Sequence, residues 1–225
     1  VSLPKTVLQP KPSPQSDAED NGQAGGLSIS TLCVEEDSGL EVFAQNADEA
    51  RPPASMVKMM LMLLVAEGLQ EGKWKLDTPI TVTRHASEMQ PSKLGVREGE
   101  TWPLDHLMKG IACISANDGA MAVAEGLWGS EEAYMTRMND RARELGMKQS
   151  EFHSVHGLPP AKGQKPDRTT ARDMALLART CVRYPQIILW VGTKEFQFRP
   201  DESPRPCTNK LLARVPGCDG LKTGF

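Results

Sequence analysis

The sequence lacks the features that mark several classes of protein. Its 26 lysine and arginine residues are outnumbered by 29 aspartate and glutamate residues, giving a net charge of -3. With no basic stripe, this composition argues against nucleic acid and anionic membrane surfaces as partners. The longest apolar run, residues 56–66, contains a lysine and is far shorter than the ~20 residues of a membrane span. A chain without an initiator methionine or a signal peptide is expected to be a processed, recombinant or partial form.

Metal-binding and disulfide patterns are also scarce. No CxxC pair is present, so a zinc knuckle is not expected. His153 and His156 are three residues apart but lack an HExxH pattern, which favours a structural role. An odd number of unevenly spaced cysteines is not a disulfide framework, although Cys207 and Cys218 flank a short segment that could form a bridged hairpin. Cys113 is expected to be a small buried apolar residue.

What the sequence does contain predicts a single α+β domain. Residues 1–24, with four prolines among polar residues, are expected to form an extended tail or linker before a domain over residues 25–225. The domain's patterns predict strands at 27–34, 40–44, 80–83, 195–198 and 218–225, and helices at 55–70, 103–114, 117–128, 130–145 and 170–183. Strands at both ends indicate an antiparallel sheet built from the two termini, with an inserted helical lobe.

The stretch SMVK, residues 55–58, is the first candidate for chemistry. A serine and a lysine three residues apart on a helix share one face, and a serine at the helix N-terminus lies in the positive end of the helix dipole. A neutral lysine there can take the proton of the serine hydroxyl. The same spacing occurs at Ser2 and Lys5 in the proline-rich tail, but only Ser55 opens a long apolar helix.

Two further short motifs follow in the chain. The first, SAN at residues 115–117, lies between two predicted helices, where its serine and amide can face one cleft or simply cap the second helix. The second, KTG at residues 222–224, offers a cation, a hydroxyl and a glycine that lets a ligand approach the backbone. Each motif alone is weak. Together with SMVK they resemble the motif set of penicillin-binding proteins and class A β-lactamases.

Over residues 25–225 the chain resembles the low-molecular-mass D-alanyl-D-alanine carboxypeptidases, penicillin-binding serine peptidases that trim peptidoglycan stem peptides. The similar segments, in chain order, are QNADEARPPASMVKMM, ISANDGAMAVAEG, FHSVHGL, TARDMALLAR and DGLKTGF. The resemblance implies a penicillin-binding/β-lactamase-like α+β fold. In that family two more strands and a helix, with a basic residue near the substrate carboxylate, follow the KTG strand. We therefore expect the natural chain to continue beyond Phe225.

The resemblance also implies roles for the residues of the first two motifs. Ser55 would be the acylated nucleophile, and Lys58 would be its general base. Ser115 would relay a proton to the leaving D-alanine, and Asn117 would hold the substrate backbone and Lys58. Because a neighbouring cation disfavours a second positive charge, Lys222 would help to keep Lys58 neutral.

The third motif is expected to bind the substrate's free carboxylate. By the same resemblance, Lys222 and Thr223 would grip this group beside Gly224. The backbone N–H groups of Ser55 and Phe225 would form the oxyanion hole, where the loss of one donor typically costs ~3 kcal/mol of transition-state stabilisation.

The implied function is removal of the terminal D-alanine from stem peptides ending in D-Ala-D-Ala. No metal or cofactor is expected, and β-lactams would be covalent inhibitors. The site would face the cell wall after export, on the outer face of the bacterial membrane or in the periplasm. A membrane anchor would require segments that this sequence does not contain.

Two alternatives stay open. Class A β-lactamases use a loop glutamate for deacylation, whereas Glu151 and Glu195 lack the Glu-x-x-Leu-Asn context, and Ala116 stands where that family has aspartate. The other alternative is a non-catalytic relative that binds peptidoglycan.

Overall fold

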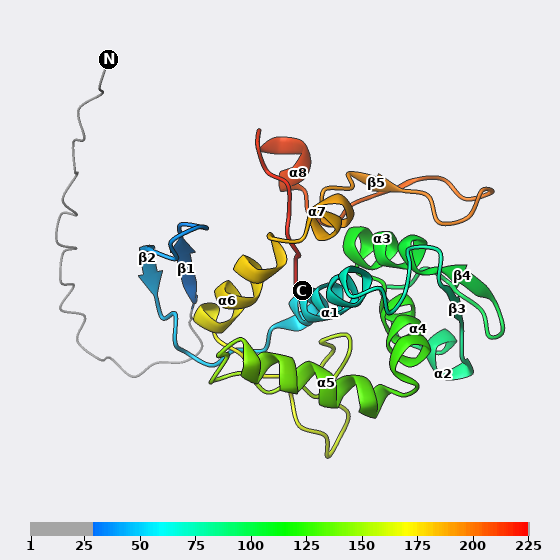
Figure 1. Ribbon diagram of the computed structural model, residues 1–225, viewed down its shortest axis with the longest axis horizontal. Helices are drawn as coiled ribbons and strands as arrows, with labels where there is room; N and C mark the ends of the chain where they lie inside the picture. Colours follow the sequence, from blue (N-terminus) through cyan, green and yellow to red (C-terminus); the bar gives the residue numbers. More distant parts are fainter. Residues whose placement is uncertain (1–28, 225) are drawn as a thin grey trace.

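The computed structural model describes residues 29–224, in which helices surround a central helix and small β-sheets lie at the periphery (Figure 1). The predicted tail at 1–24 and Phe225 lie outside the described residues. The elements are β1 (Thr31–Val34), β2 (Glu41–Gln45), the 3₁₀ turn η1 (Ala54–Val57), α1 (Lys58–Gln70), β3 (Pro79–Thr81), α2 (Arg84–Ser87), β4 (Thr101–Pro103), α3 (Leu104–Ile114), α4 (Asn117–Trp128), α5 (Glu131–Glu144), α6 (Ala171–Cys181), α7 (Pro185–Val191), β5 (Glu195–Phe196), β6 (Arg205–Pro206) and α8 (Leu211–Arg214).

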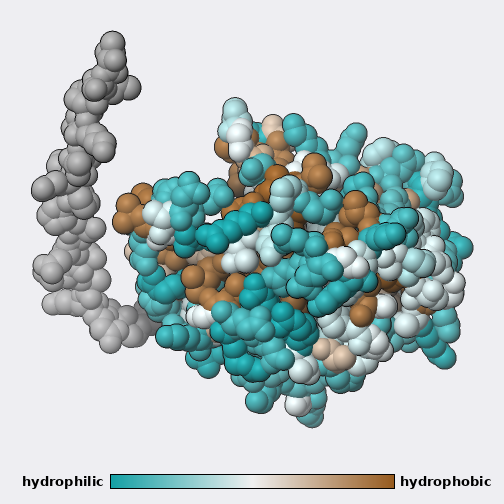
Figure 2. Space-filling model, in the orientation of Figure 1, coloured by the Kyte–Doolittle hydropathy of each residue, from teal (hydrophilic) through white to brown (hydrophobic). Residues whose placement is uncertain are grey.

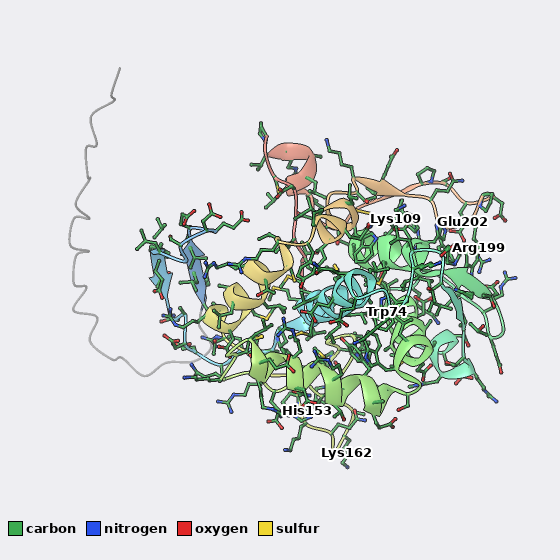
Figure 3. All side chains as sticks on the ribbon, viewed as in Figure 1. Trp74, Lys109, His153, Lys162, Arg199 and Glu202 are labelled. Carbon is green, nitrogen blue, oxygen red and sulfur yellow. A yellow bond between two sulfur atoms is a disulfide. The ribbon has the colours of Figure 1, made fainter. Side chains whose placement is uncertain are left out.

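Helix α1 lies at the centre of the core. Ten of its thirteen residues are buried, as expected for a helix that is apolar on almost every side. Helices α3, α4, α5, α6 and α7 all contact it. Trp74 packs beside it, where its indole Nε1 donates to the carbonyl of Val65 at 2.9 Å (Figure 3). The core therefore holds the beginning of α1, where Ser55 and Lys58 lie, in a fixed position.

The predicted helices are confirmed with small changes in their bounds. The Ser130 hydroxyl accepts from the backbone N–H of Ala133 at the start of α5, and Thr170 does the same for Asp173 at the start of α6. Three helices in the described residues were not predicted, α2, α7 and α8, and α7 begins with Pro185 in its first turn.

The strands form three separate two-stranded antiparallel sheets in the described residues. The predicted hairpin near the N-terminus is confirmed as β1–β2, with Thr31 opposite Gln45. Within residues 29–224, the strand predicted at 218–225 and the single sheet from both termini are not formed, because residues 218–224 belong to no strand. A groove of about 720 Å³ lies between β1, α6 and Lys222, and β1 pairs only with β2 in the described residues. Figure 2 shows apolar surface on this side of the molecule.

The cysteine prediction needs correction. Cys207 is bonded to Cys113, and Cys218 is free, so the bridge from Cys207 to Cys218 is not formed. The reason is spatial: β5 and β6 pack back against α3, which brings together two cysteines that are 94 residues apart in sequence. Cys113 is buried as expected, but it is part of a covalent link and not an inert core residue.

Candidate active site

Ser55 and Lys58 form a hydrogen-bonded pair at the start of α1. Ser55 lies in the η1 turn, which leads directly into the helix and places it one turn before Lys58. The Lys58 Nζ lies 2.9 Å from the Ser55 Oγ and 2.8 Å from the carbonyl oxygen of His156. Lys58 is fully buried, and no carboxylate among residues 29–224 forms an ion pair with it.

The surroundings of Lys58 favour its neutral form. Burial lowers the pKa of its amine well below the usual range, Lys222 lowers this pKa further, and Asp167 opposes them. A neutral amine keeps a lone pair and two N–H groups. It can therefore donate to the His156 carbonyl while accepting the proton of the Ser55 hydroxyl, as a general base must.

A glycine turn positions the His156 carbonyl against the serine turn. Ala54 has a φ of +48° just before Ser55, and Gly157 has a φ of +78° opposite it. A Cβ at Gly157 would lie only 2.0 Å from the Ala54 carbonyl oxygen. Only glycine allows the two turns to approach this closely, and their contact brings His156 to Lys58.

The SAN motif lies at the junction of α3 and α4. Ser115 ends α3 in the left-handed conformation, with φ 64° and ψ 33°, and Asn117 begins α4. The Asn117 Nδ2 donates to the carbonyls of Gln90 and Pro91, each at 2.9 Å. The Ser115 Oγ and the Asn117 Oδ1 are buried without a hydrogen-bond partner in the described part of the chain. Such atoms are uncommon in folded proteins and suit a site that receives a polar ligand.

The structure does not form every contact expected of Asn117. No hydrogen bond joins it to Lys58 within residues 29–224; its amide donates to the two backbone carbonyls of Gln90 and Pro91 instead. Its role toward a substrate stays a prediction.

The KTG segment lies against the serine turn. A Cβ at Gly224 would lie 3.1 Å from the Pro53 carbonyl oxygen and 3.3 Å from the Ala54 Cβ, so a side chain would push the segments apart. Figure 1 shows this C-terminal segment, in red, running to the beginning of α1. Lys222 is buried, which lowers its pKa to about 8, and its Nζ donates to the Thr223 carbonyl at 2.8 Å.

A chain of hydrogen bonds connects KTG to the end of α3, two residues before the SAN motif. The Thr223 hydroxyl donates to the Thr208 hydroxyl at 3.0 Å, and the backbone N–H and the hydroxyl of Thr208 both donate to the Cys113 carbonyl, at 2.9 and 3.2 Å. The disulfide between Cys113 and Cys207 runs beside this chain, two residues before Ser115. KTG thus packs against the serine turn through Gly224, and hydrogen bonds through Thr208 link it to the end of α3, next to SAN.

The comparison with known families agrees with this arrangement. A model of the peptidase S11 family, described as D-alanyl-D-alanine carboxypeptidase, matches residues 20–225. The chain belongs to this family. Its fold is accordingly the predicted α+β fold of the penicillin-binding DD-carboxypeptidases.

Individual members of the S11 family are similar along most of this chain. The whole of this chain aligns with D-alanyl-D-alanine carboxypeptidase DacF of Bacillus subtilis at 33% identity. For DacC of Escherichia coli, 83% of this chain aligns at 35% identity. The aligned part covers 58% of DacF and 47% of DacC. The chain therefore spans about half the length of the curated relatives it matches.

Solved structures of penicillin-binding proteins superpose closely on this chain. Penicillin binding protein 6B of Escherichia coli matches 91% of this chain, and 65% of its own length is covered, with a TM-score of 0.80 and 26% identity. Penicillin-Binding Protein D2 of Listeria monocytogenes, in its ampicillin-bound form, matches 91% of this chain and is itself 82% covered, with a TM-score of 0.76 and 27% identity.

Three contributors to the candidate site are not predicted from the sequence: the His156 carbonyl, Thr208 and the Cys113–Cys207 bridge. The segment FHSVHGL resembles the family, and its HGL turn is the signal in the sequence for the first of them. Phe225, predicted for the oxyanion hole, lies outside the described residues.

Proposed function

We propose that this chain carries the active site of a serine DD-carboxypeptidase, which removes the terminal D-alanine from peptidoglycan stem peptides. The observation that supports this most is the pair formed by Ser55 and Lys58. A buried amine with a depressed pKa, 2.9 Å from a hydroxyl, is the arrangement needed to generate a serine nucleophile near neutral pH. The relatives' names, D-alanyl-D-alanine carboxypeptidases, support the substrate.

In the proposed acylation step, the Ser55 Oγ attacks the carbonyl carbon of the penultimate D-alanine while Lys58 takes the hydroxyl proton. The C–N bond to the terminal D-alanine then breaks, and the leaving amine receives a proton through the Ser115 hydroxyl. The unpartnered Ser115 Oγ suits this relay, because it has no competing bond within residues 29–224. Water then hydrolyses the ester on Ser55 and restores the enzyme.

Recognition of the substrate is assigned to the remaining motif residues. Lys222, whose pKa is lowered to about 8, is still mostly protonated at pH 7 and can pair with the free carboxylate of the peptide. Thr223 adds a hydroxyl, and Gly224 keeps the segment close to Ser55. The backbone N–H groups of Ser55 and Phe225 are proposed to bind the oxyanion.

β-Lactams are proposed as covalent inhibitors of the same serine. They would acylate Ser55 and leave an ester that water removes slowly. The ampicillin-bound and cefotaxime-bound structures of the similar Listeria monocytogenes protein support this proposal.

We further propose that the site works on the cell-wall side of the membrane after export, because its substrate is peptidoglycan. Within residues 29–224, no helix has both the length and the apolarity that crossing a membrane requires.

The test is incubation with a fluorescent penicillin, followed by gel detection and intact mass. A stable adduct is expected on the unmodified protein and on Ser2→Ala, which alters the other SxxK in the chain, but not on Ser55→Ala. Rapid β-lactam turnover without an adduct would instead favour the β-lactamase alternative. No adduct and no turnover would favour a non-catalytic peptidoglycan-binding protein.

A further inference from the structure

A buried carboxylate that belongs to none of the three motifs holds a loop beside the SAN motif. Asp118, directly after Asn117, is fully buried, and no lysine or arginine among the described residues forms an ion pair with it. Its two oxygens accept four backbone N–H groups at 2.8–3.2 Å, those of Leu94, Gly95, Val96 and Gly119. Three of these donors come from one loop more than twenty residues earlier in the chain, so the carboxylate serves as an anchor for that loop.

The other half of this loop holds Asn117. We refer to residues 90–96 as the wall loop. Its carbonyls at Gln90 and Pro91 accept both N–H groups of the Asn117 amide, and its Ser92 carbonyl accepts the Asn117 backbone N–H at 2.7 Å. The Ser92 hydroxyl also donates to the Ile114 carbonyl at 2.8 Å. One end of the wall loop is therefore fixed by Asp118, and the other end fixes Asn117.

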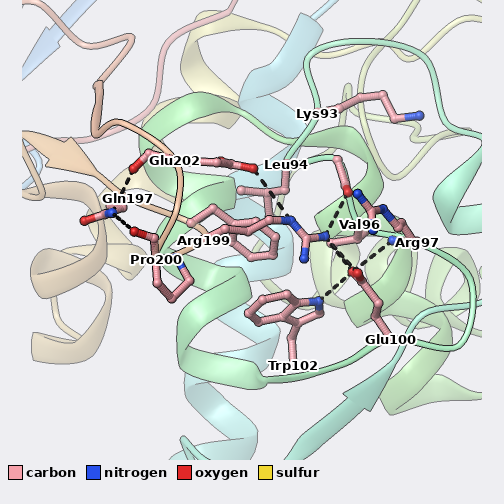
Figure 4. A network of polar contacts seen from close by, with 12 residues as sticks. Lys93, Leu94, Val96, Arg97, Glu100, Trp102, Gln197, Arg199, Pro200 and Glu202 are labelled. Atoms are coloured by element: carbon pink, nitrogen blue, oxygen red, sulfur yellow. Dashed lines mark hydrogen bonds and ion pairs between the residues drawn. The ribbon is translucent and has the colours of Figure 1, made fainter.

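The outer side of the wall loop has weaker support. Arg199 donates to the Gly95 carbonyl at 3.1 Å. It also donates to the Glu100 carboxylate, a contact that Figure 4 shows. Arg205 donates to the Lys93 carbonyl at 3.0 Å. These contacts are exposed or only partly buried, whereas the four bonds to Asp118 are buried or partly buried, where hydrogen bonds are stronger and less screened by water.

The wall loop decides which polar group Asn117 offers to a ligand. An amide can rotate to exchange its donor and acceptor ends unless its partners prevent this. Here two loop carbonyls take both N–H groups, which leaves the Oδ1 acceptor without a partner in the described residues. If the loop moved, the amide would lose both partners and with them its orientation.

We propose that Asp118 is a positioning residue for acyl transfer: it anchors the wall loop, and the loop in turn fixes the orientation of the Asn117 amide beside Ser115. This inference rests on the proposed function for its kinetic consequence, and on the structure alone for the anchoring itself.

The first experiment compares Asp118→Asn with Asp173→Asn. Asp173 is the matched control, because it is also a buried aspartate in the first turn of a helix and also accepts a loop N–H, that of Gln149 at 2.8 Å. None of its hydrogen bonds among residues 29–224 involves the three motifs. We expect Asp118→Asn to lower the acylation rate constant of the folded protein at saturating penicillin by about tenfold to a hundredfold. Asp173→Asn should change it less than about threefold, after correction for the folded fraction measured by thermal unfolding.

The second experiment asks whether Asp118 acts through Asn117. In a double-mutant cycle, Asp118→Asn should have less than about a threefold further effect on acylation once Asn117→Ala is present, because the residue to be positioned is gone. Effects that multiply, or a wild-type acylation rate in Asp118→Asn, would overturn the proposal.

The third experiment does not depend on activity. Hydrogen exchange followed by NMR should show faster exchange of the Leu94, Gly95 and Val96 amides and of the Asn117 side-chain amide in Asp118→Asn than in Asp173→Asn. Unchanged exchange at these positions would overturn the anchoring. If penicillin does not acylate the unmodified protein, the proposed function fails while this arm still decides the inference. Should Asp118→Asn not fold, Asp118→Glu, which keeps the charge but displaces it by one methylene, is tested with the same expectations.

Discussion

The two sides of the candidate site are built in different ways. Ser55 and Lys58 lie at the start of the most buried helix of the molecule, and packing on nearly every side holds them. The KTG segment belongs to no strand in the described residues, and its contacts are single hydrogen bonds and the approach of Gly224 to the serine turn.

This difference matches what each side is proposed to do. A base made from lysine needs a dry environment, because burial is what lowers the pKa of its amine. In the segment proposed to recognise a ligand's carboxylate, Lys222 is also buried, but Thr223 is partly exposed and Gly224 is exposed. The fold supports this segment from one side through Thr208 and the Cys113–Cys207 bridge. Breaking each side separately should have distinct consequences.

The largest effect on acylation is expected from Lys58→Met, on the side of the site formed by Ser55 and Lys58. Methionine suits a buried position but cannot take a proton, so acylation by penicillin should fall by roughly 10³-fold, within the range of a lost general base. Stability should not fall, since a buried amine is replaced by an apolar group of similar length. Stopped-flow acylation and thermal unfolding measure the two quantities.

The control for that variant is Met60→Leu, a fully buried neighbour on the same helix. It should leave acylation within about twofold of the unmodified protein, because a volume-conserving swap changes packing only slightly. Acylation by Lys58→Met within tenfold of the unmodified protein would rule out Lys58 as the base.

On the side of the KTG segment, reduction of the Cys113–Cys207 disulfide should lower the free energy of unfolding. The bridge closes a loop of 94 residues, for which chain-entropy estimates give about 4–5 kcal/mol, and native bridges typically contribute about 2–5 kcal/mol. Denaturant unfolding with and without a thiol reductant measures the change. The double variant Cys113→Ala with Cys207→Ala should already show the lower stability and should not respond to the reductant.

Cys218→Ala is the discriminating control for that bridge. Because Cys218 is free, this variant should keep the full response to reductant. Loss of the response in Cys218→Ala would mean that the native bridge joins Cys207 to Cys218.

The contact between the serine turn and the glycine turn can be broken with Gly157→Ala. Its Cβ would lie 2.0 Å from the Ala54 carbonyl at a positive φ, so we expect a loss of about 2–4 kcal/mol in unfolding free energy. Acylation should fall as well, because the His156 carbonyl would move away from Lys58.

Gly163→Ala is the control that separates the steric clash expected at Gly157 from the cost of placing alanine at a positive φ. Gly163 has a φ of +89° but nothing within 4 Å of its Cβ position, so only the conformational cost of about 1 kcal/mol should appear, with acylation unchanged. Equal losses in the two variants would show that the close approach at Gly157 is unimportant.

The same contrast explains how much the sequence could predict. Helix α1 is apolar on almost every side, and helices α3–α6 have apolar periodicity or clear caps, such as Ser130 and Thr170; all five form where expected. Helix α7 was missed because a short apolar run such as IILWV suits a strand or a helix equally. Strand β4 was missed because its pairing with β3 involves only three residues, and the strand expected at 218–225 has no partner in the described residues.

For the site, the motif residues were identified from their order and from the family resemblance, and local pattern alone would have left each one weak. For the His156 contribution the sequence offers only the HGL turn, whose Gly157 permits the close approach, because residue type does not reveal which backbone carbonyl contacts Lys58. The pairing of Cys113 with Cys207 depends on how β6 packs against α3, a long-range arrangement that cysteine spacing does not determine.

The smallest effect, and the one that links the two sides, concerns the pH dependence of acylation. Lys58 must be neutral and Lys222 protonated, so the rate should rise with pH through the pKa of Lys58 and fall above the pKa of Lys222, at about 8. In Lys222→Gln the fall in rate at high pH, the alkaline limb, should disappear. The rise in rate at lower pH, the acid limb, should move to higher pH, because removal of a neighbouring cation raises the pKa of Lys58. Lys210→Gln, a lysine with no ion pair in the described residues, should leave both limbs in place. If the acid limb of Lys222→Gln stays where it is in the unmodified protein, burial alone keeps Lys58 neutral, and the two sides are electrostatically independent.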